Sequence, residues 1–182
     1  MCRFMSAIVG DPVIARDQFF GYPDCFSVWD PTPFQGLATG DHFVQNANSG
    51  AADAACDGAI KPRLSFQAHS APIANSFDAN ATNMYVTFHG SWNRQPPTGF
   101  KVVEIPFTQL EGGEYDPVAA ADSREGYTDV FGAANPQGCT ANGLTMSNCF
   151  RLTASAWDPA GRGLVVGSDN ASEGEIYLLS KS

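Results

Sequence analysis

The most constraining feature of this chain is a series of short apolar segments separated by turns rich in Gly, Pro and Asn. β-Branched and aromatic residues fill these segments and often alternate with polar ones, which predicts β-strands. No segment offers ten residues of clean 3.6-residue periodicity, and the best helical candidate, 116–126, is short and contains Pro117 near its start. The chain is therefore predicted to be all-β. The expected strands are 26–30, 41–45, 63–72, 83–90, 100–107, 126–131, 152–157, 163–167 and 175–180.

The spacing of the strands narrows the fold class. One group lies near 64–107 and a second near 150–180, and each is typical of a small antiparallel meander. Meanders that repeat about every 40–50 residues predict β-propeller blades. A β-sandwich has similar local signals and is the alternative. Because a propeller needs about four to eight blades, two or three meanders predict a partial, open β-propeller of four-stranded antiparallel blades.

Charge argues against one class of partner. The 182 residues carry 10 Lys and Arg against 19 Asp and Glu, a formal net charge of −9, with no basic run. A phosphate-backbone partner needs a positive surface, so the sequence predicts no binding to nucleic acid. No apolar run approaches the length of a transmembrane span, so we also expect no membrane partner.

The cysteines predict two disulfides. None of Cys2, Cys25, Cys56, Cys139 and Cys149 belongs to a CxxC pair, so a structural zinc site has little support. Cys139 and Cys149 bracket a polar loop, and Cys25 and Cys56 bracket a longer segment rich in Gly, Ala and Asn. A bridge would close each loop, which predicts the pairs Cys25–Cys56 and Cys139–Cys149 with Cys2 unpaired.

Paired cysteines are typical of an oxidising compartment. Asn-x-Ser/Thr sequons at Asn80 and Asn170 agree with an extracellular location. Yet the apolar run at 7–10 is too short for the hydrophobic region of a signal peptide. Secreted-type chemistry without a signal predicts that this chain lacks its beginning.

A cluster of functional side chains follows the strand 83–90. His89, Trp92, Asn93 and Arg94 fall within six residues, at the kind of strand-to-loop junction that lines the funnel of a propeller. In the structural interpretation, Arg94 pairs with an acidic neighbour and Trp92 packs in the core. In the functional one, Arg94 and Asn93 hold a planar carboxylate while Trp92 offers a stacking face.

The other two histidines are separate from this cluster. His69 lies in "QAHSAP", at another strand-to-loop junction, and taken alone is typical of a structural histidine. His42 has no polar neighbours of interest and is predicted to lie on the surface. Because no HxH or HxxxH spacing occurs, the histidines give little support for a metal site.

Four segments together resemble one enzyme family. "GYPDCFSVWD", "PRLSFQAHSAP", "MYVTFHGSWNRQPPTGFKVVEIPF" and "AWDPAGRGLVVGSDNASEGEIYLLSK" are similar to the C-terminal half of the fungal PQQ-dependent pyranose dehydrogenases. These enzymes belong with the sorbosone and soluble quinoprotein glucose dehydrogenases. The resemblance covers residues 21–182 and leaves 1–20 as an unmatched N-terminal segment.

The resemblance implies an extracellular six-bladed propeller that holds pyrroloquinoline quinone (PQQ) and calcium. It implies oxidation of an aldose or ketoaldose at the hemiacetal carbon, with a haem domain or a quinone as electron acceptor. A histidine of the family takes the hydroxyl proton, and we place this general base at His69. His89, Trp92, Asn93 and Arg94 become the expected cofactor contacts, and the calcium ligands stay unassigned.

The resemblance leaves two function classes open. One is a PQQ-dependent sugar dehydrogenase represented by part of its chain. The other is a truncated, non-catalytic propeller or carbohydrate-binding module. Dye reduction with several sugars, in the presence of PQQ and calcium, separates the two.

Overall fold

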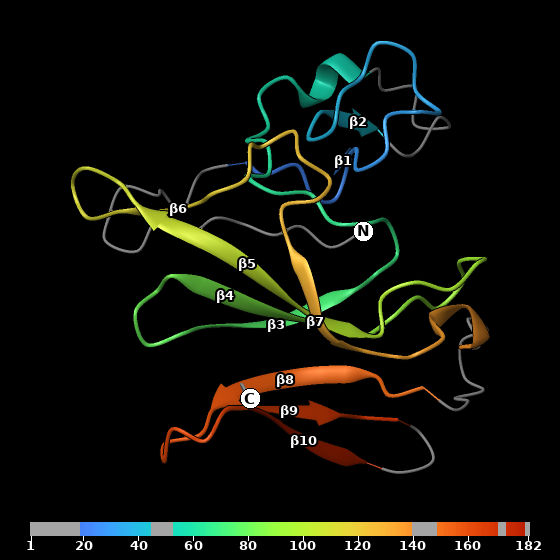
Figure 1. Cartoon of the computed structure of the whole chain (residues 1–182). Coiled ribbons are helices and arrows are strands. Elements are labelled where there is room, and N and C mark those ends of the chain that lie inside the picture. The colour runs from blue at the N-terminus through green and yellow to red at the C-terminus, as the bar shows by residue number, and fades with distance from the viewer. Residues whose placement is uncertain (1–18, 45–52, 140–148, 171–173, 181–182) are drawn as a thin grey trace. The chain divides into compact units, whose positions relative to one another are not determined.

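The computed structural model describes residues 19–44, 53–139, 149–170 and 174–180 (Figure 1). Over these residues the chain forms strands and two short 3-10 helices, with no α-helix. The prediction of an all-β protein is therefore confirmed, and the segment 116–126 forms no helix. That segment contains the end of a short strand and turns instead. The elements are β1 (Cys25–Ser27), β2 (His42–Val44), η2 (Asp53–Cys56), β3 (Pro72–Phe77), β4 (Asn83–Phe88), β5 (Lys101–Gln109), β6 (Tyr115–Pro117), β7 (Thr128–Gly132), η3 (Pro136–Gly138), β8 (Leu152–Trp157), β9 (Leu164–Ser168) and β10 (Glu175–Leu179).

The chain divides into two compact units. The first unit comprises residues 3–67 and 108–126. Its β1 and β2 pair antiparallel, and Arg63 forms a bidentate ion pair with Asp116, at 2.8–3.0 Å. Arg63 also donates to the carbonyl of Pro117 at 2.7 Å. A two-pronged contact of this kind fixes the chain before β3 to the strand β6.

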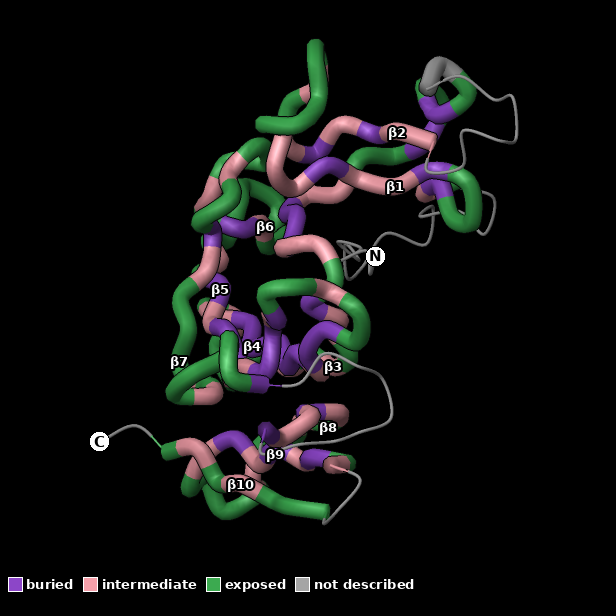
Figure 2. The backbone as a smooth tube through the Cα atoms, turned by 90° about the vertical axis from the view of Figure 1, so that its right-hand side faces the viewer, coloured by how far each residue is buried: buried purple, intermediate pink, exposed green. Residues whose placement is uncertain are grey.

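The second unit, residues 68–107 and 127–182, contains the better-developed sheets. In its first sheet β3 pairs with β4, β4 with β5, and β5 with β7, all antiparallel. This four-stranded meander is the arrangement expected of one blade. Strand β4 is buried over five consecutive residues, because both of its faces are covered. Figure 2 shows where the buried parts of the chain lie.

A second sheet of the same unit consists of β8, β9 and β10 in antiparallel order. Strand β8 lies against β3 and β4. The core between the sheets contains Tyr85 and Val102 from the first sheet and Leu152, Leu164 and Val166 from the second. Burial of these apolar side chains holds one meander on the next.

The strand predictions held best where alternation was strong, and failed in one segment. Residues 63–71 alternate like a strand but form none, although Leu64 and Phe66 are buried. The strand begins at Pro72 instead, where the segment "PIANSF" pairs with β4.

Both predicted disulfides are confirmed. Cys25 is bonded to Cys56 and Cys139 to Cys149, with Cα–Cα separations of 5.8 and 5.6 Å. Cys2 lies outside the described residues.

Candidate functional site

Two loops of the second unit meet at one end of the β3–β4 pair. The first loop, 68–71, leads into β3, and the second, 89–100, leaves β4. Backbone hydrogen bonds join them, from His89 N to Ala71 O (2.9 Å) and from Gly90 N to Ser70 O (3.1 Å). The antiparallel pairing thus brings the sequence motifs "AHSAP" and "HGSWNR" together, as the site hypothesis requires.

Glycine permits the close approach of these two loops. Gly99 has φ +84°, and a Cβ built on it would lie 2.6 Å from the carbonyl oxygen of Ser70 and 2.8 Å from the Cα of Gly90. Only a residue without a Cβ fits there. His69 (φ 67°) and Phe100 (φ 57°) also occupy the left-handed region. Conformations of this kind concentrate at ligand-binding loops.

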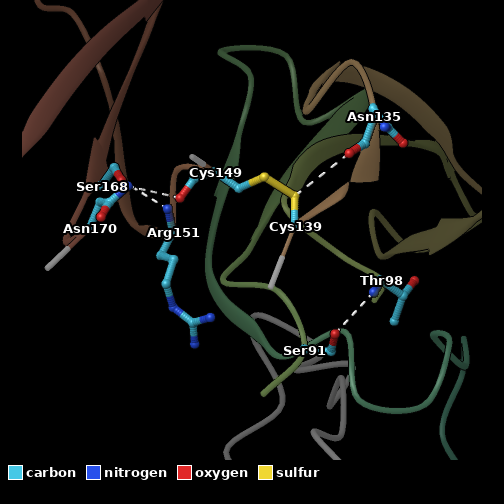
Figure 3. Close-up of a disulfide and its surroundings, with 8 residues drawn as sticks. All are labelled: Ser91, Thr98, Asn135, Cys139, Cys149, Arg151, Ser168 and Asn170. Carbon is cyan, nitrogen blue, oxygen red and sulfur yellow. Dashed lines mark hydrogen bonds between the residues drawn. A yellow bond between two sulfur atoms is a disulfide. The ribbon is translucent and has the colours of Figure 1, made fainter. Parts of the chain in front are cut away.

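A small internal turn shapes the second loop. The backbone N–H of Ser91 donates to Thr98 O at 2.7 Å, and the N–H of Thr98 donates to the Ser91 hydroxyl at 3.0 Å (Figure 3). Ser91 is fully buried, whereas Trp92 is 65% exposed and Asn93 is exposed. The turn therefore presents Trp92 to solvent, which contradicts the interpretation that it packs in the core.

Arg94 connects the two loops through its side chain. Its Nη1 donates to the carbonyl of Ala68 at 3.0 Å, next to the exposed His69. Among the described residues Arg94 forms no ion pair. Glu104, an acid ten residues further along the chain, accepts a hydrogen bond from Tyr85 Oη. The half-buried guanidinium is thus held beside His69 with donors to spare and without a carboxylate partner.

His89 differs from the other members of the cluster, because both of its ring nitrogens have partners. Arg151 Nη2 lies 2.8 Å from Nδ1, and Asp169 Oδ1 lies 2.8 Å from Nε2. Since a guanidinium only donates, Nδ1 is the acceptor and Nε2 carries the proton that Asp169 accepts. His89 is therefore held as one neutral tautomer between a cation and an anion.

Arg151 is the functional side chain that the sequence interpretation missed. Burial lowers the pKa of its guanidinium, and the Asp169 carboxylate works in the opposite direction. Its Nε is buried without a hydrogen-bond partner among the described residues. Two further bonds hold this segment in place. Arg151 N donates to Ser168 Oγ at 2.9 Å (Figure 3), and Asp169 N donates to Arg151 O at 3.0 Å. The sequence held one signal for Arg151: like the other site residues, it lies where a strand meets a loop, directly before β8.

His42 is not a surface residue, so that prediction is wrong. It is 8% exposed on β2 and lines a hollow of about 500 Å³ in the first unit, beside Cys56 and Lys61. Pairing with β1 buries the strand despite its polar sequence context.

No group of three or more His, Cys, Asp or Glu side chains suited to a metal occurs in the described ranges. Nor do these ranges contain a helix that is long and apolar enough to span a membrane.

Comparison with known proteins places the chain in a family. A family model described as TrAA12-like matches residues 4–182, nearly the whole sequence. The chain belongs to the TrAA12-like family. It is 40% identical over 178 residues to a pyrroloquinoline quinone-dependent pyranose dehydrogenase of Coprinopsis cinerea. It is 33% identical over 168 residues to a pyrroloquinoline quinone-dependent sugar dehydrogenase of Hypocrea jecorina.

Solved structures agree with this membership. The PQQ domain of Coprinopsis cinerea pyranose dehydrogenase, in its holo form, matches 92% of the chain with a TM-score of 0.79 and 41% identity. A calcium structure of a Trichoderma reesei family AA12 protein matches 90% with a TM-score of 0.73 and 33% identity. These likenesses confirm the prediction of an all-β propeller fold.

The relatives are considerably longer than this chain. The matched part spans 24% of the Coprinopsis cinerea dehydrogenase and 34% of the Hypocrea jecorina one. It spans 42% of the solved PQQ domain and 38% of the Trichoderma reesei structure.

Proposed function

We propose that this chain takes part in PQQ-dependent oxidation of a sugar, an aldose or ketoaldose, at its hemiacetal carbon. The observation that carries the proposal is the Arg94 guanidinium, held next to His69 without a carboxylate partner among the described residues. In a protein of net charge −9, a half-buried cation of this kind is suited to an anionic ligand. The printed names of the relatives supply the identity of that ligand.

The donor set fits the cofactor. PQQ carries carboxylates, and Arg94 can approach one of them with the nitrogens that Ala68 does not use. The buried Nε of Arg151, which lacks an acceptor in the described part of the chain, is a second donor of the same chemistry. A buried donor without an acceptor is costly, and a bound carboxylate would remove that cost.

The remaining cluster residues have distinct roles in the proposal. Trp92 offers an exposed indole face for stacking against a flat ring, and Asn93 offers an amide beside it. His89 has an indirect role, because Arg151 and Asp169 occupy both of its ring nitrogens: it positions the Arg151 guanidinium. Asp169 in turn fixes the tautomer of His89.

His69 is the proposed general base. It is exposed at the mouth of the two loops, and the Arg94–Ala68 hydrogen bond fixes the backbone beside it. A neutral imidazole there would take the proton of the sugar hydroxyl as the carbon–hydrogen bond is broken. When bound, PQQ supplies the two-electron acceptor for the hydride.

Calcium belongs to the proposal at the level of the family, supported by the calcium structure of the Trichoderma reesei protein. No ligands are assigned to it.

Residues 21–182 are the proposed C-terminal portion of a longer quinoprotein propeller. The electron acceptor is proposed to be a haem domain or a quinone, and the location to be extracellular. The two disulfides support that location.

The test is binding followed by turnover. Titration of PQQ into the purified chain, with and without calcium, is expected to show saturable binding that His69→Ala leaves intact. Reduction of an artificial dye with several sugars should then require His69. Saturable binding without dye reduction for any sugar would favour the non-catalytic alternative. Absence of PQQ binding under both conditions would overturn the proposal.

A further inference from the structure

The turn between β3 and β4, residues 78–82, is a rigid and exposed hairpin tip (Figure 1). Asp78 N donates to Asn83 O at 2.9 Å, and Ala81 N donates to Asp78 O at 3.1 Å. The backbone N–H and the hydroxyl of Thr82 donate to the Asp78 carboxylate at 2.8 and 2.9 Å. Asn80 lies at the tip, is exposed, and makes no hydrogen bond within the described residues.

Asn80, Ala81 and Thr82 form an Asn-x-Thr sequon, the acceptor pattern for N-linked glycans. The second sequon, at Asn170, has a different environment. Asn170 is half-buried, and its Nδ2 donates to the carbonyl of Cys149 at 2.9 Å, next to the Cys139–Cys149 bridge (Figure 3). The amide nitrogen that a glycan would modify is thus free at Asn80 but used by the fold at Asn170.

We propose that Asn80 is an N-glycan attachment site of this protein and that Asn170 is not. The inference rests on the proposed extracellular location. In the transfer step, the anomeric carbon of a lipid pyrophosphate-linked oligosaccharide forms a bond to Asn80 Nδ2. The carbon–oxygen bond to the pyrophosphate breaks, the amide loses one proton, and the lipid pyrophosphate is the leaving group. The co-reactant is the glycan donor of the secretory pathway.

The topology keeps a glycan at Asn80 away from the candidate site. β3 and β4 are antiparallel and six residues long, with the hairpin tip at one end and the loops 68–71 and 89–100 at the other. Six extended residues span roughly 20 Å. A glycan on the tip therefore leaves His69 and Arg94 accessible.

The chain, placed behind a cleavable secretion signal in a yeast, tests the proposal. Peptide mass spectrometry after enzymatic deglycosylation, which converts a modified Asn to Asp, reads the occupancy of each sequon directly. A glycan transferred to Asn170 before folding would prevent the bond from Asn170 to the Cys149 carbonyl and so hinder folding. Protein retained in the membrane fraction is therefore measured together with secreted protein. Asn80→Gln is expected to abolish the modification, while Thr82→Ser and Asn170→Gln preserve it.

An unmodified Asn80 in chains that entered the secretory pathway would overturn the proposal, as would equal occupancy of Asn170. The measurement is independent of PQQ, so its failure is distinguishable from failure of the proposed function. A second readout concerns the fold: non-reducing peptide mapping of the modified chains should find the Cys139–Cys149 bridge closed.

Discussion

Replacement of Gly99 by alanine tests the packing of the two site loops against a matched control. Gly99 (φ +84°) and Gly161 (φ +71°) both occupy the left-handed region, but a Cβ at Gly161 meets nothing within 4 Å. Alanine in this region costs about 1–2 kcal/mol, offset by about 0.4–1 kcal/mol from the less flexible unfolded chain. Gly161→Ala should therefore change the free energy of unfolding by about 1 kcal/mol or less.

Gly99→Ala carries a further steric cost, because the new Cβ overlaps the backbone of Ser70 and Gly90. Overpacking costs about 1–3 kcal/mol, and separation of the loops loses the Gly90–Ser70 hydrogen bond, worth about 1 kcal/mol. The extra 2–4 kcal/mol corresponds to a fall in Tm of roughly 4–16 °C beyond that of the control. Thermal unfolding followed by circular dichroism measures both variants. Equal Tm values for the two would refute the reasoning.

Three further predictions follow from the same contacts. Arg94→Ala should weaken PQQ binding about ten- to hundredfold, from the loss of a charge-assisted hydrogen bond worth roughly 1.5–3 kcal/mol; Arg162→Ala, at an exposed turn, should leave the affinity unchanged in the same titration. Opening the Cys25–Cys56 bridge (separation 31) should cost about 3.7 kcal/mol and opening Cys139–Cys149 (separation 10) about 2.7 kcal/mol, so denaturant unfolding of the two double-alanine variants should rank them in that order. Burial opposes ionisation of Asp78, but hydrogen bonds to its carboxylate lower its pKa below the ordinary 3.8. The ionised carboxylate therefore stabilises the fold fully above pH 3.8, and this stabilisation is lost as the pH falls through the folded pKa. The loss of stability caused by Asp78→Asn should shrink on acidification, and a loss that is constant with pH would contradict this.

Local pattern was enough to predict much of the fold. Alternation in 175–180 reflects a strand with one face toward the core, and the apolar residues of 100–107 form a strand buried on both faces at Val102 and Val103. The disulfides were predictable because each closes a polar loop. β3 was not predictable, since "PIANSF" starts with Pro72, lacks a clear alternation of apolar and polar residues and forms a strand through pairing with β4. The opposite error occurred at 63–71, where alternation predicted a strand that does not form. Leu64 is buried there without the hydrogen bonds of a sheet.

The site was predictable only in its local parts. His89 and Arg94 stand out because they gather within six residues after a strand. The partners of His89 do not, since Arg151 and Asp169 are 62 and 80 residues away in the sequence. Only the packing of β8 against β3 and β4 brings those residues to the loop. The burial of His42 is likewise a consequence of tertiary structure.

Chemical shifts of the tryptophan indoles test the central claim, that the loops 68–71 and 89–100 form the cofactor site. The chain has three tryptophans, and their indole N–H signals resolve readily in a 15N-labelled sample. On titration with PQQ, the account predicts a saturable shift of the Trp92 signal, reduced at equal PQQ concentration by Arg94→Ala. The signals of Trp29 and Trp157 should stay in place. Saturable binding that shifts Trp29 or Trp157 and leaves Trp92 unmoved would contradict the account.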